Sequence, residues 1–294
     1  MIAAVASALA LLITGSSAET EAAALTAREK AALLVVAGMP APGGFGGVLV
    51  RQWTTDDPRP GGALVFADQE GGIVKTFSRI APWRAASSYR SSAEAFAAGR
   101  ETAAGLRSAG VDGDFAPVLD LPDGPLGSRQ FARPEYGVAF AQGLGAAACV
   151  KHFPGLGSTP LSTDAARVYG ALRAQDLAPF RAAVKAGVPC VMVGHAIYPR
   201  LGSRRASLEP ATYRLLRGTG FRGVAITDSL GVLGSPFAPY WARLAIEAGA
   251  DLVLTTSARD AGRMVDALVP LARAGTLDAK VVRVLRYRKL VQAR

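Results

Sequence analysis

The sequence predicts an α/β fold, a single (β/α)8 barrel of the TIM type with an irregular start. Short apolar runs alternate with amphipathic segments along the chain, which is typical of parallel strands joined by crossover helices. Several apolar runs end in polar residues, and the carboxyl ends of barrel strands are where such barrels form their pocket. The chain has 294 residues, and one barrel uses roughly 250. We therefore expect one barrel and no second domain.

Eight short apolar runs are the expected strands. They cover residues 33–37, 46–50, 63–68, 113–119, 147–152, 190–195, 223–227 and 251–255. Seven amphipathic segments are the expected helices, several of which end at glycine: 91–109, 135–145, 173–187, 209–217, 238–248, 259–274 and 278–292. The first two strands are too close for a helix between them, and residues 51–62 are too short and too rich in Pro and Gly for a good one. A doubly wound open sheet is the alternative.

The N-terminal stretch has the composition of a secretory leader. Met1 to Ala18 carries no charge, is apolar from Ile2 to Ile13 and ends in small residues, which resembles a signal peptide with its cleavage site. We expect residues 1–18 to be a signal peptide, residues 19–294 to be the barrel domain, and the protein to be exported or associated with the cell envelope. An apolar N-terminal helix or a misplaced start codon is the alternative. The stretch is too short to span a membrane, and no later segment qualifies.

Composition excludes several classes of function. The net charge is +10, but the basic residues form no stripe interleaved with aromatic residues, so we expect no nucleic-acid partner. A basic surface favours anionic polymers such as cell-wall glycans, although solubility explains it equally well. Gly71-Gly72 lacks the spacing of a dinucleotide-binding motif, and no P-loop is present. Cys149 and Cys190 each lie in an expected strand, and we predict two reduced core thiols, not a disulfide or part of a metal site.

Six motifs, five of them at expected strands, carry a resemblance to a known family. They are Asp68-Gln-Glu-Gly-Gly72, Phe115-Ala-Pro-Val-Leu-Asp120, Lys151-His-Phe-Pro-Gly155, Val191-Met-Val-Gly-His195, Ala206-Ser-Leu-Glu-Pro210 and the run from Gly223 to Asp228. In this order they resemble glycoside hydrolase family 3, from about Leu25 to the C-terminus. The resemblance is greatest to its single-domain branch, the bacterial β-N-acetylglucosaminidases that trim cell-wall sugars.

The resemblance implies an enzyme that hydrolyses β-linked N-acetylglucosamine or a related β-glycoside with retention of configuration. Asp228 stands where the family keeps its nucleophile, a role that requires an ionised carboxylate. Four further residues match positions that bind sugar hydroxyls: Asp68, Arg129, Lys151 and His152. His195 fits either a pocket-lining residue or a core histidine. This chemistry requires no metal and no cofactor, and we expect a monomer with a carbohydrate as its substrate.

The chain departs from the family where the proton donor is expected. In the single-domain branch, the loop after Lys-His-Phe-Pro-Gly continues with His and then carries an Asp-Ser-His triplet whose Asp-His pair is the general acid/base. Here Leu156 replaces that first His, Ser162 stands at the Asp position and Asp164 at the second His position.

Three interpretations of this departure remain open. Asp164 is itself a carboxylic acid/base, as in glycosidases with two carboxylates. Alternatively the donor is lost and hydrolysis is slow, or the protein is a pseudoenzyme that only binds glycans.

Overall fold

The computed structural model describes residues 18–293, and its central feature is a sheet of eight parallel strands. The strands are β1 (Val35–Gly38), β2 (Gly47–Leu49), β3 (Leu64–Ala67), β6 (Gly113–Asp114), β7 (Cys149–Phe153), β8 (Cys190–Val193), β9 (Val224–Ser229) and β10 (Leu252–Thr255). Each overlaps one of the eight strands expected from the sequence. An antiparallel hairpin, β4 (Gln69–Gly71) and β5 (Val74–Lys75), follows β3.

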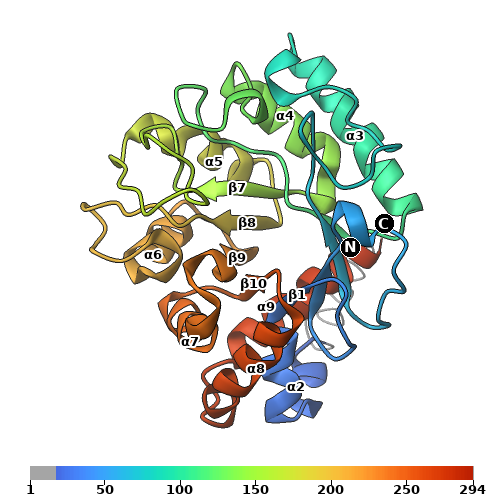
Figure 1. Cartoon of the computed structure of the whole chain (residues 1–294), viewed down its shortest axis with the longest axis vertical. Helices are drawn as coiled ribbons and strands as arrows, with labels where there is room; N and C mark the ends of the chain where they lie inside the picture. Colours follow the sequence, from blue (N-terminus) through green and yellow to red (C-terminus); the bar gives the residue numbers. More distant parts are fainter. Residues whose placement is uncertain (1–17, 294) are drawn as a thin grey trace, which may run out of the picture.

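The sheet closes into a barrel. Its strand order is β6-β3-β2-β1-β10-β9-β8-β7, and the two outer strands are joined by parallel bridges between Asp114 and Ala148 and between Val118 and Lys151. The helices are arranged around this ring of strands (Figure 1). Closure confirms the (β/α)8 barrel and excludes the open sheet.

The structure confirms the seven helices that the sequence predicts and adds α2, and residues 18–24 are also helical. They are α2 (Ala27–Leu33), α3 (Ser92–Ser108), α4 (Pro134–Leu144), α5 (Ala174–Lys185), α6 (Pro210–Gly218), α7 (Ala238–Ala248), α8 (Ala258–Arg273) and α9 (Asp278–Gln292). The sequence patterns above do not predict α2, which begins with a capping box between Thr26 and Glu29. The irregular start is also confirmed, because residues 51–62 contain a single 3-10 turn, η1 (Gln52–Thr54), and no α-helix.

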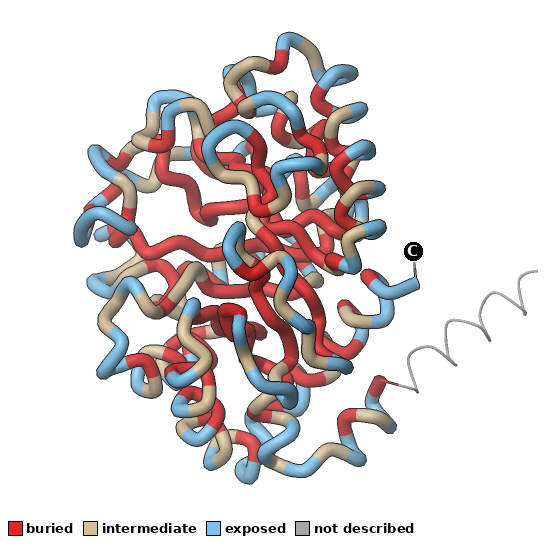
Figure 2. Tube along the Cα trace, turned by 45° about the vertical axis from the view of Figure 1, so that its right-hand side comes forward, coloured by how far each residue is buried: buried red, intermediate tan, exposed pale blue. Residues whose placement is uncertain are grey.

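The core lies inside the barrel and between the strands and their helices. Buried residues run along the strands, and exposed residues lie on the outer faces of the helices (Figure 2). At the end where the strands begin, Tyr287 of α9 stacks on Phe66 of β3 with ring centroids 6.5 Å apart. The buried carboxylate of Asp251, just before β10, forms ion pairs with Arg217 at 2.6 Å and with Arg283 of α9. The C-terminal helix is therefore part of the barrel and covers the end at which the strands begin.

The two cysteines form a disulfide, so the prediction of two reduced thiols is wrong. Cys149 and Cys190 are direct partners in the register of β7 and β8, and their sulfurs are bonded to each other. Because adjacent strands in register bring the two Cα atoms within 4.3 Å, the sulfurs can reach each other without a change in the sheet. Both residues are fully buried.

The leader prediction falls largely outside the described residues. Residues 1–17 are not described, so the signal peptide at residues 1–18 stays a prediction. Within residues 18–293, no helix has the length and apolar character needed to cross a membrane. The same residues contain no cluster of three or more His, Cys, Asp or Glu side chains arranged to hold a metal ion.

Candidate active site

The predicted site residues gather at one end of the barrel because they follow or end parallel strands. Asp68 directly follows β3, Lys151 and His152 lie near the end of β7, and Asp228 lies near the end of β9. Arg129 ends the 3-10 turn η3 (Gly127–Arg129) in the segment after β6. The carboxyl ends of parallel strands meet at one face of a barrel, so segments far apart in sequence supply one pocket.

Lys151 joins two carboxylates at the centre of this face. Its Nζ lies 2.6 Å from Asp68 Oδ1 and 2.6 Å from Glu70 Oε1. Arg129 completes the cluster through a bidentate ion pair with Glu70. Its Nε donates to Glu70 Oε2 at 2.7 Å and its Nη2 donates to Glu70 Oε1 at 2.8 Å. The side chains of Lys151 and Glu70 are only 3% and 2% exposed, whereas that of Asp68 is 34% exposed. Asp68 therefore presents the accessible oxygen of this network.

The network holds Glu70 and Lys151 in their charged forms. Burial alone would raise the pKa of Glu70, but the charge of Lys151 and the hydrogen bonds of Arg129 outweigh burial and keep that pKa below its ordinary value. Burial opposes the charge of Lys151, yet Asp68 and Glu70 raise its pKa. Two of the predicted sugar-binding residues, Lys151 and Arg129, thus carry charged donors held by paired carboxylates, which suit recognition of hydroxyl groups.

His152 is oriented by a buried carboxylate. Its Nδ1 lies 2.6 Å from Asp120 Oδ2, and Asp120 Oδ1 accepts a hydrogen bond from the backbone N–H of Leu156 at 2.7 Å. A carboxylate that accepts from the ring assigns the proton to Nδ1. Asp120 therefore positions both the imidazole and the first turn of the loop after β7.

Asp228 is a partly buried carboxylate held in its ionised form. Burial would raise its pKa, but electrostatic interactions with His195, His152 and Lys151 and a hydrogen bond from the Ser229 N–H at 2.7 Å lower that pKa below its ordinary value. Lys151 is a lasting cation among these groups, because Asp68 and Glu70 raise its pKa against the effect of burial. The side chain thus has the charge that a nucleophile in glycoside cleavage needs.

His195 is a core histidine and not an open pocket residue. It is fully buried. Its Nδ1 lies 2.7 Å from Ser207 Oγ and its Nε2 lies 3.0 Å from the carbonyl oxygen of Ser229. Both ring nitrogens are therefore occupied, and the imidazole links the segment after β8 to the end of β9, directly behind Asp228.

The structure does not bring Asp164 into contact with the other site residues. Asp164 is exposed in the loop after β7, where its backbone N–H donates to Ser162 Oγ at 3.3 Å. Because this loop follows the carboxyl end of β7, it lies at the same end of the barrel as the other candidate residues. No hydrogen bond links it to Asp228, Lys151 or His152 within residues 18–293.

Comparison with known proteins places this arrangement in a family. The family model described as the glycosyl hydrolase family 3 N terminal domain matches residues 49–287. The chain belongs to glycosyl hydrolase family 3. A β-hexosaminidase of Stenotrophomonas maltophilia is 36% identical over 227 residues, 67% of each chain, and one of Xanthomonas oryzae pv. oryzae is 37% identical over 232 residues, again 67% of each.

Two solved structures share the fold. A β-N-acetylglucosaminidase from Paenibacillus sp. str. FPU-7 superposes with a TM-score of 0.80 at 26% identity over 92% of this chain, which spans 63% of that one. LpqI of M tuberculosis superposes with a TM-score of 0.78 at 29% identity and covers 91% of this chain and 95% of its own. The family predicted from the strand-end motifs is thereby confirmed.

Two carboxylates of this family 3 site were not singled out from the sequence. Glu70 and Asp120 both lie inside the quoted motifs, and each follows an apolar run, but only the structure shows that they hold Arg129, Lys151 and His152. A third, Asp114, is fully buried, and Gln69 N donates to its Oδ1 at 2.9 Å. Burial raises the pKa of Asp114 to about 8, so this group is protonated at neutral pH beneath the site.

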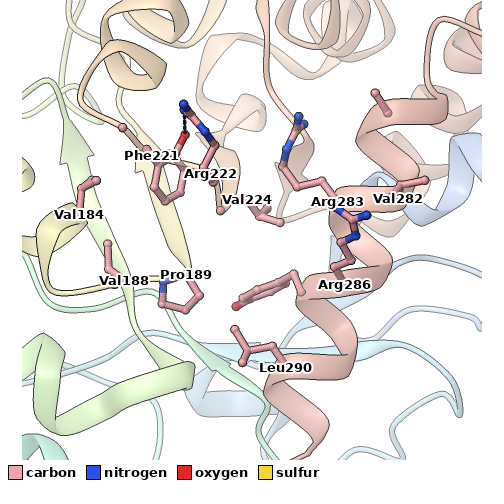
Figure 3. Close-up of a pocket in the computed structure, with 15 residues that line it drawn as sticks. Val184, Val188, Pro189, Phe221, Arg222, Val224, Val282, Arg283, Arg286 and Leu290 are labelled. Atoms are coloured by element: carbon pink, nitrogen blue, oxygen red, sulfur yellow. Dashed lines mark hydrogen bonds between the residues drawn. The ribbon is translucent and has the colours of Figure 1, made fainter. Parts of the chain in front are cut away.

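A pocket of about 520 Å³ lies away from these family 3 residues. It is formed by α9 and by the loops that precede β8 and β9. Arg283 and Arg286 extend from α9 on one side, and Val188, Pro189 and Phe221 lie on the other (Figure 3). This is the end where the strands begin, and residues there support barrel stability and not chemistry. The candidate active site therefore remains at the opposite end.

Proposed function

We propose that the protein hydrolyses β-linked N-acetylglucosamine or a related β-glycoside of the cell wall, as a monomer and with retention of configuration. The observation that carries the proposal is the carboxylate of Asp228 at the end of β9. Electrostatic interactions with groups that include His152 and Lys151 lower its pKa and so favour its ionised form. The relatives named β-hexosaminidase and β-N-acetylglucosaminidase support the choice of sugar.

The proposed reaction has two steps. Asp228 attacks the anomeric carbon while the bond to the leaving oxygen breaks, and Asp164 gives its proton to that oxygen. Asp164 then takes a proton from water, the water attacks the anomeric carbon, and the bond to Asp228 breaks. Asp68, Arg129, Lys151 and His152 hold the sugar hydroxyls during both steps. The loop after β7 must move Asp164 toward the leaving oxygen when substrate binds.

Turnover of an activated aryl β-N-acetylglucosaminide by the wild-type protein and by Asp228→Asn tests the proposal. Wild-type turnover that is lost in Asp228→Asn supports it, since the amide cannot act as the nucleophile. Equal rates in both proteins remove Asp228 from the mechanism. The matching aryl β-glucoside identifies the preferred sugar.

A non-catalytic glycan-binding protein is the second candidate, and the position of Asp164 favours it. The carboxylate is exposed and makes no contact with the ionic network, and loss of general acid–base catalysis slows a reaction by about 10²- to 10⁴-fold. Binding of N-acetylglucosamine without turnover of either aryl glycoside would support this candidate.

We also propose that the protein works outside the cytoplasm. The Cys149–Cys190 disulfide supports this, because disulfides persist in exported and envelope proteins and are rare in a reducing cytoplasm. Fractionation of cells that express the full chain, with mass determination of the N-terminus, tests both export and cleavage after Ala18.

A further inference from the structure

The pocket at the amino ends of the strands has a basic side and an apolar side. It lies between α9 and the segments that lead into β8 and β9, and we call it the α9 pocket. Its volume of about 520 Å³ is within the range of sites for small organic molecules. In Figure 3, Arg222 and Arg283 lie toward one end of the pocket, and Val188 and Leu290 lie toward the other. The pocket therefore has the shape and polarity for an elongated ligand with two different ends.

Arg222 supplies a positive charge that no carboxylate of residues 18–293 neutralises. It forms no ion pair there, and its Nη1 donates to the backbone carbonyl oxygens of Arg217 at 3.4 Å and Phe221 at 3.2 Å. Burial lowers the pKa of Arg217, and the charges of Arg283 and Arg222 lower it further. The guanidinium groups around the pocket therefore repel one another.

The other arginines of the α9 pocket have few carboxylates to share. Asp251 is fully buried and forms ion pairs with both Arg217 and Arg283. Arg286 pairs with Glu19, but both side chains are exposed, and solvent and salt weaken such a pair. Cations that lie together in a partly desolvated place favour a bound anion.

The apolar side suits a hydrocarbon chain. Val188 and Pro189 line it from the segment before β8, and Leu290 lines it from α9. Leu290 is 51% exposed, so a chain that covers it removes apolar surface from water and favours binding. An inorganic anion would contact the arginines without using this wall, and a neutral hydrocarbon would use the wall without the arginines. Both sides together select a molecule that is anionic at one end and apolar at the other.

We propose that the α9 pocket binds a single-chain amphiphile with an anionic head, a carboxylate or a phosphate. The head lies against Arg222 and Arg283, because guanidinium groups bind the oxygens of both anions through paired N–H donors. The acyl or alkyl chain lies along Val188 and Leu290.

This site is separate from the candidate active site. Val224, the first residue of β9, lines the α9 pocket, and Asp228 lies near the other end of the same strand. Four residues of extended strand span about 13 Å. An amphiphile in the pocket therefore leaves the carboxyl end of the barrel open, and the inference does not rest on the proposed function.

Calorimetry with the purified full chain tests the proposal, with soluble amphiphiles below the concentrations at which they form micelles. Octanoate and octyl phosphate should each bind about tenfold more tightly than 1-octanol, because the arginines contact only a charged head. From hexanoate to decanoate, the affinity should rise about fourfold for each added methylene. Equal affinities for both anions and 1-octanol, or no rise with chain length, overturn the proposal. The octanoate and octyl phosphate titrations show which head the pocket prefers.

Two variants separate the head from the chain. Arg222→Gln should remove most of the preference for octanoate over 1-octanol and keep the rise with chain length. Leu290→Ser should reduce that rise and keep the preference for the anion. Arg214→Gln, which changes an exposed arginine of α6 outside the lining, should bind as the wild type does. Octanoate binding that neither Arg222→Gln nor Leu290→Ser changes overturns the proposal.

Other occupants of the α9 pocket give different results. Binding to vesicles of an anionic phospholipid, without binding of any free amphiphile, would assign the basic side to a membrane surface. A dimer in light scattering that Leu290→Ser converts to a monomer would assign the apolar side to a second copy of the chain. Competition between octanoate and N-acetylglucosamine would place the amphiphile at the candidate active site. Each of these three results overturns the proposal, whereas independent binding of octanoate and the sugar supports it.

Discussion

At the scale of single residues, Lys151 is central to the proposed sugar-binding network because it is the common partner of Asp68 and Glu70. Lys151→Met keeps the volume but leaves Glu70 buried beside one cation. Removing one partner of a buried ion pair costs about 3–5 kcal/mol, and we expect a loss of this size in the free energy of unfolding, together with weaker binding of N-acetylglucosamine. Denaturation and calorimetry measure the two effects. Lys185→Met, at an exposed position on α5, is the control, and unchanged sugar binding in Lys151→Met would contradict the assignment of the pocket.

The role of Asp164 is also a question about one residue. If its carboxylate protonates the leaving oxygen, Asp164→Asn should reduce kcat/KM by about 10²- to 10⁴-fold on substrates with poor leaving groups. Activated aryl glycosides, which leave without a proton, should be affected far less. Steady-state kinetics with a series of leaving groups measures this difference, and Asp56→Asn, which changes an exposed carboxylate elsewhere, is the control. Equal losses across the series would remove Asp164 as the acid.

At the scale of elements, the disulfide ties β7 to β8, the strands that lead to Lys151 and to His195. Because the bond joins positions 41 residues apart, it restricts the unfolded chain. We expect Cys149→Ala/Cys190→Ala to lose about 2–4 kcal/mol of unfolding free energy. Denaturation without reductant measures the loss, with reduced wild-type protein for comparison. Two titratable thiols in the unreduced, unfolded wild type would contradict the bond.

The elements also show how much of the fold can be predicted from the sequence. Apolar runs and glycine stops locate the strands and the seven predicted helices, because burial and chain reversal have local signatures. The Cys149–Cys190 bond has no such signature, since it depends on the register between two strands. Thiols inside apolar runs look like ordinary core residues. The role of His195 depends likewise on a serine hydroxyl and a carbonyl from two other segments.

The residues of the candidate site also divide into those that the sequence predicts and those that only the structure shows. Asp68, Lys151, His152 and Asp228 are predictable, because polar residues that end apolar runs must face the pocket of a closed barrel. Glu70 and Asp120 stand in the same motifs, but their function is to hold other side chains, and that function exists only after the strands have come together. Asp164 aligns with a position of the family loop, yet its place on the surface is set by the conformation of that loop.

At the scale of the whole molecule, stability should depend on pH through buried carboxyl groups. The pKa of Asp114 is raised to about 8, well above the ordinary value near 3.8. Between these two pH values the folded state binds more protons at this group than the unfolded state, so its contribution to stability is present at low pH and is lost as the pH rises toward 8. The pKa of Glu70 is lowered. Its contribution to stability is therefore present near neutral pH and is lost as the pH falls below the ordinary pKa of a glutamate.

Asp114→Asn tests the first of these dependences. The amide resembles the protonated carboxyl group and can still accept from Gln69 N–H, so we expect the variant to be more stable than the wild type at pH 8 and equally stable near pH 4. Denaturant unfolding at several pH values between 4 and 8 measures the slope. The same slope in variant and wild type would assign the dependence to other groups.

The shared ion pairs of Lys151, Glu70, Asp68 and Arg129 have a consequence for how this protein can change. Each charge is compensated by the others. A substitution at one position therefore changes which side chain is most stable at the other three, and the free-energy changes of single substitutions will not add. New sugar preferences are therefore reached by exchanging these side chains together.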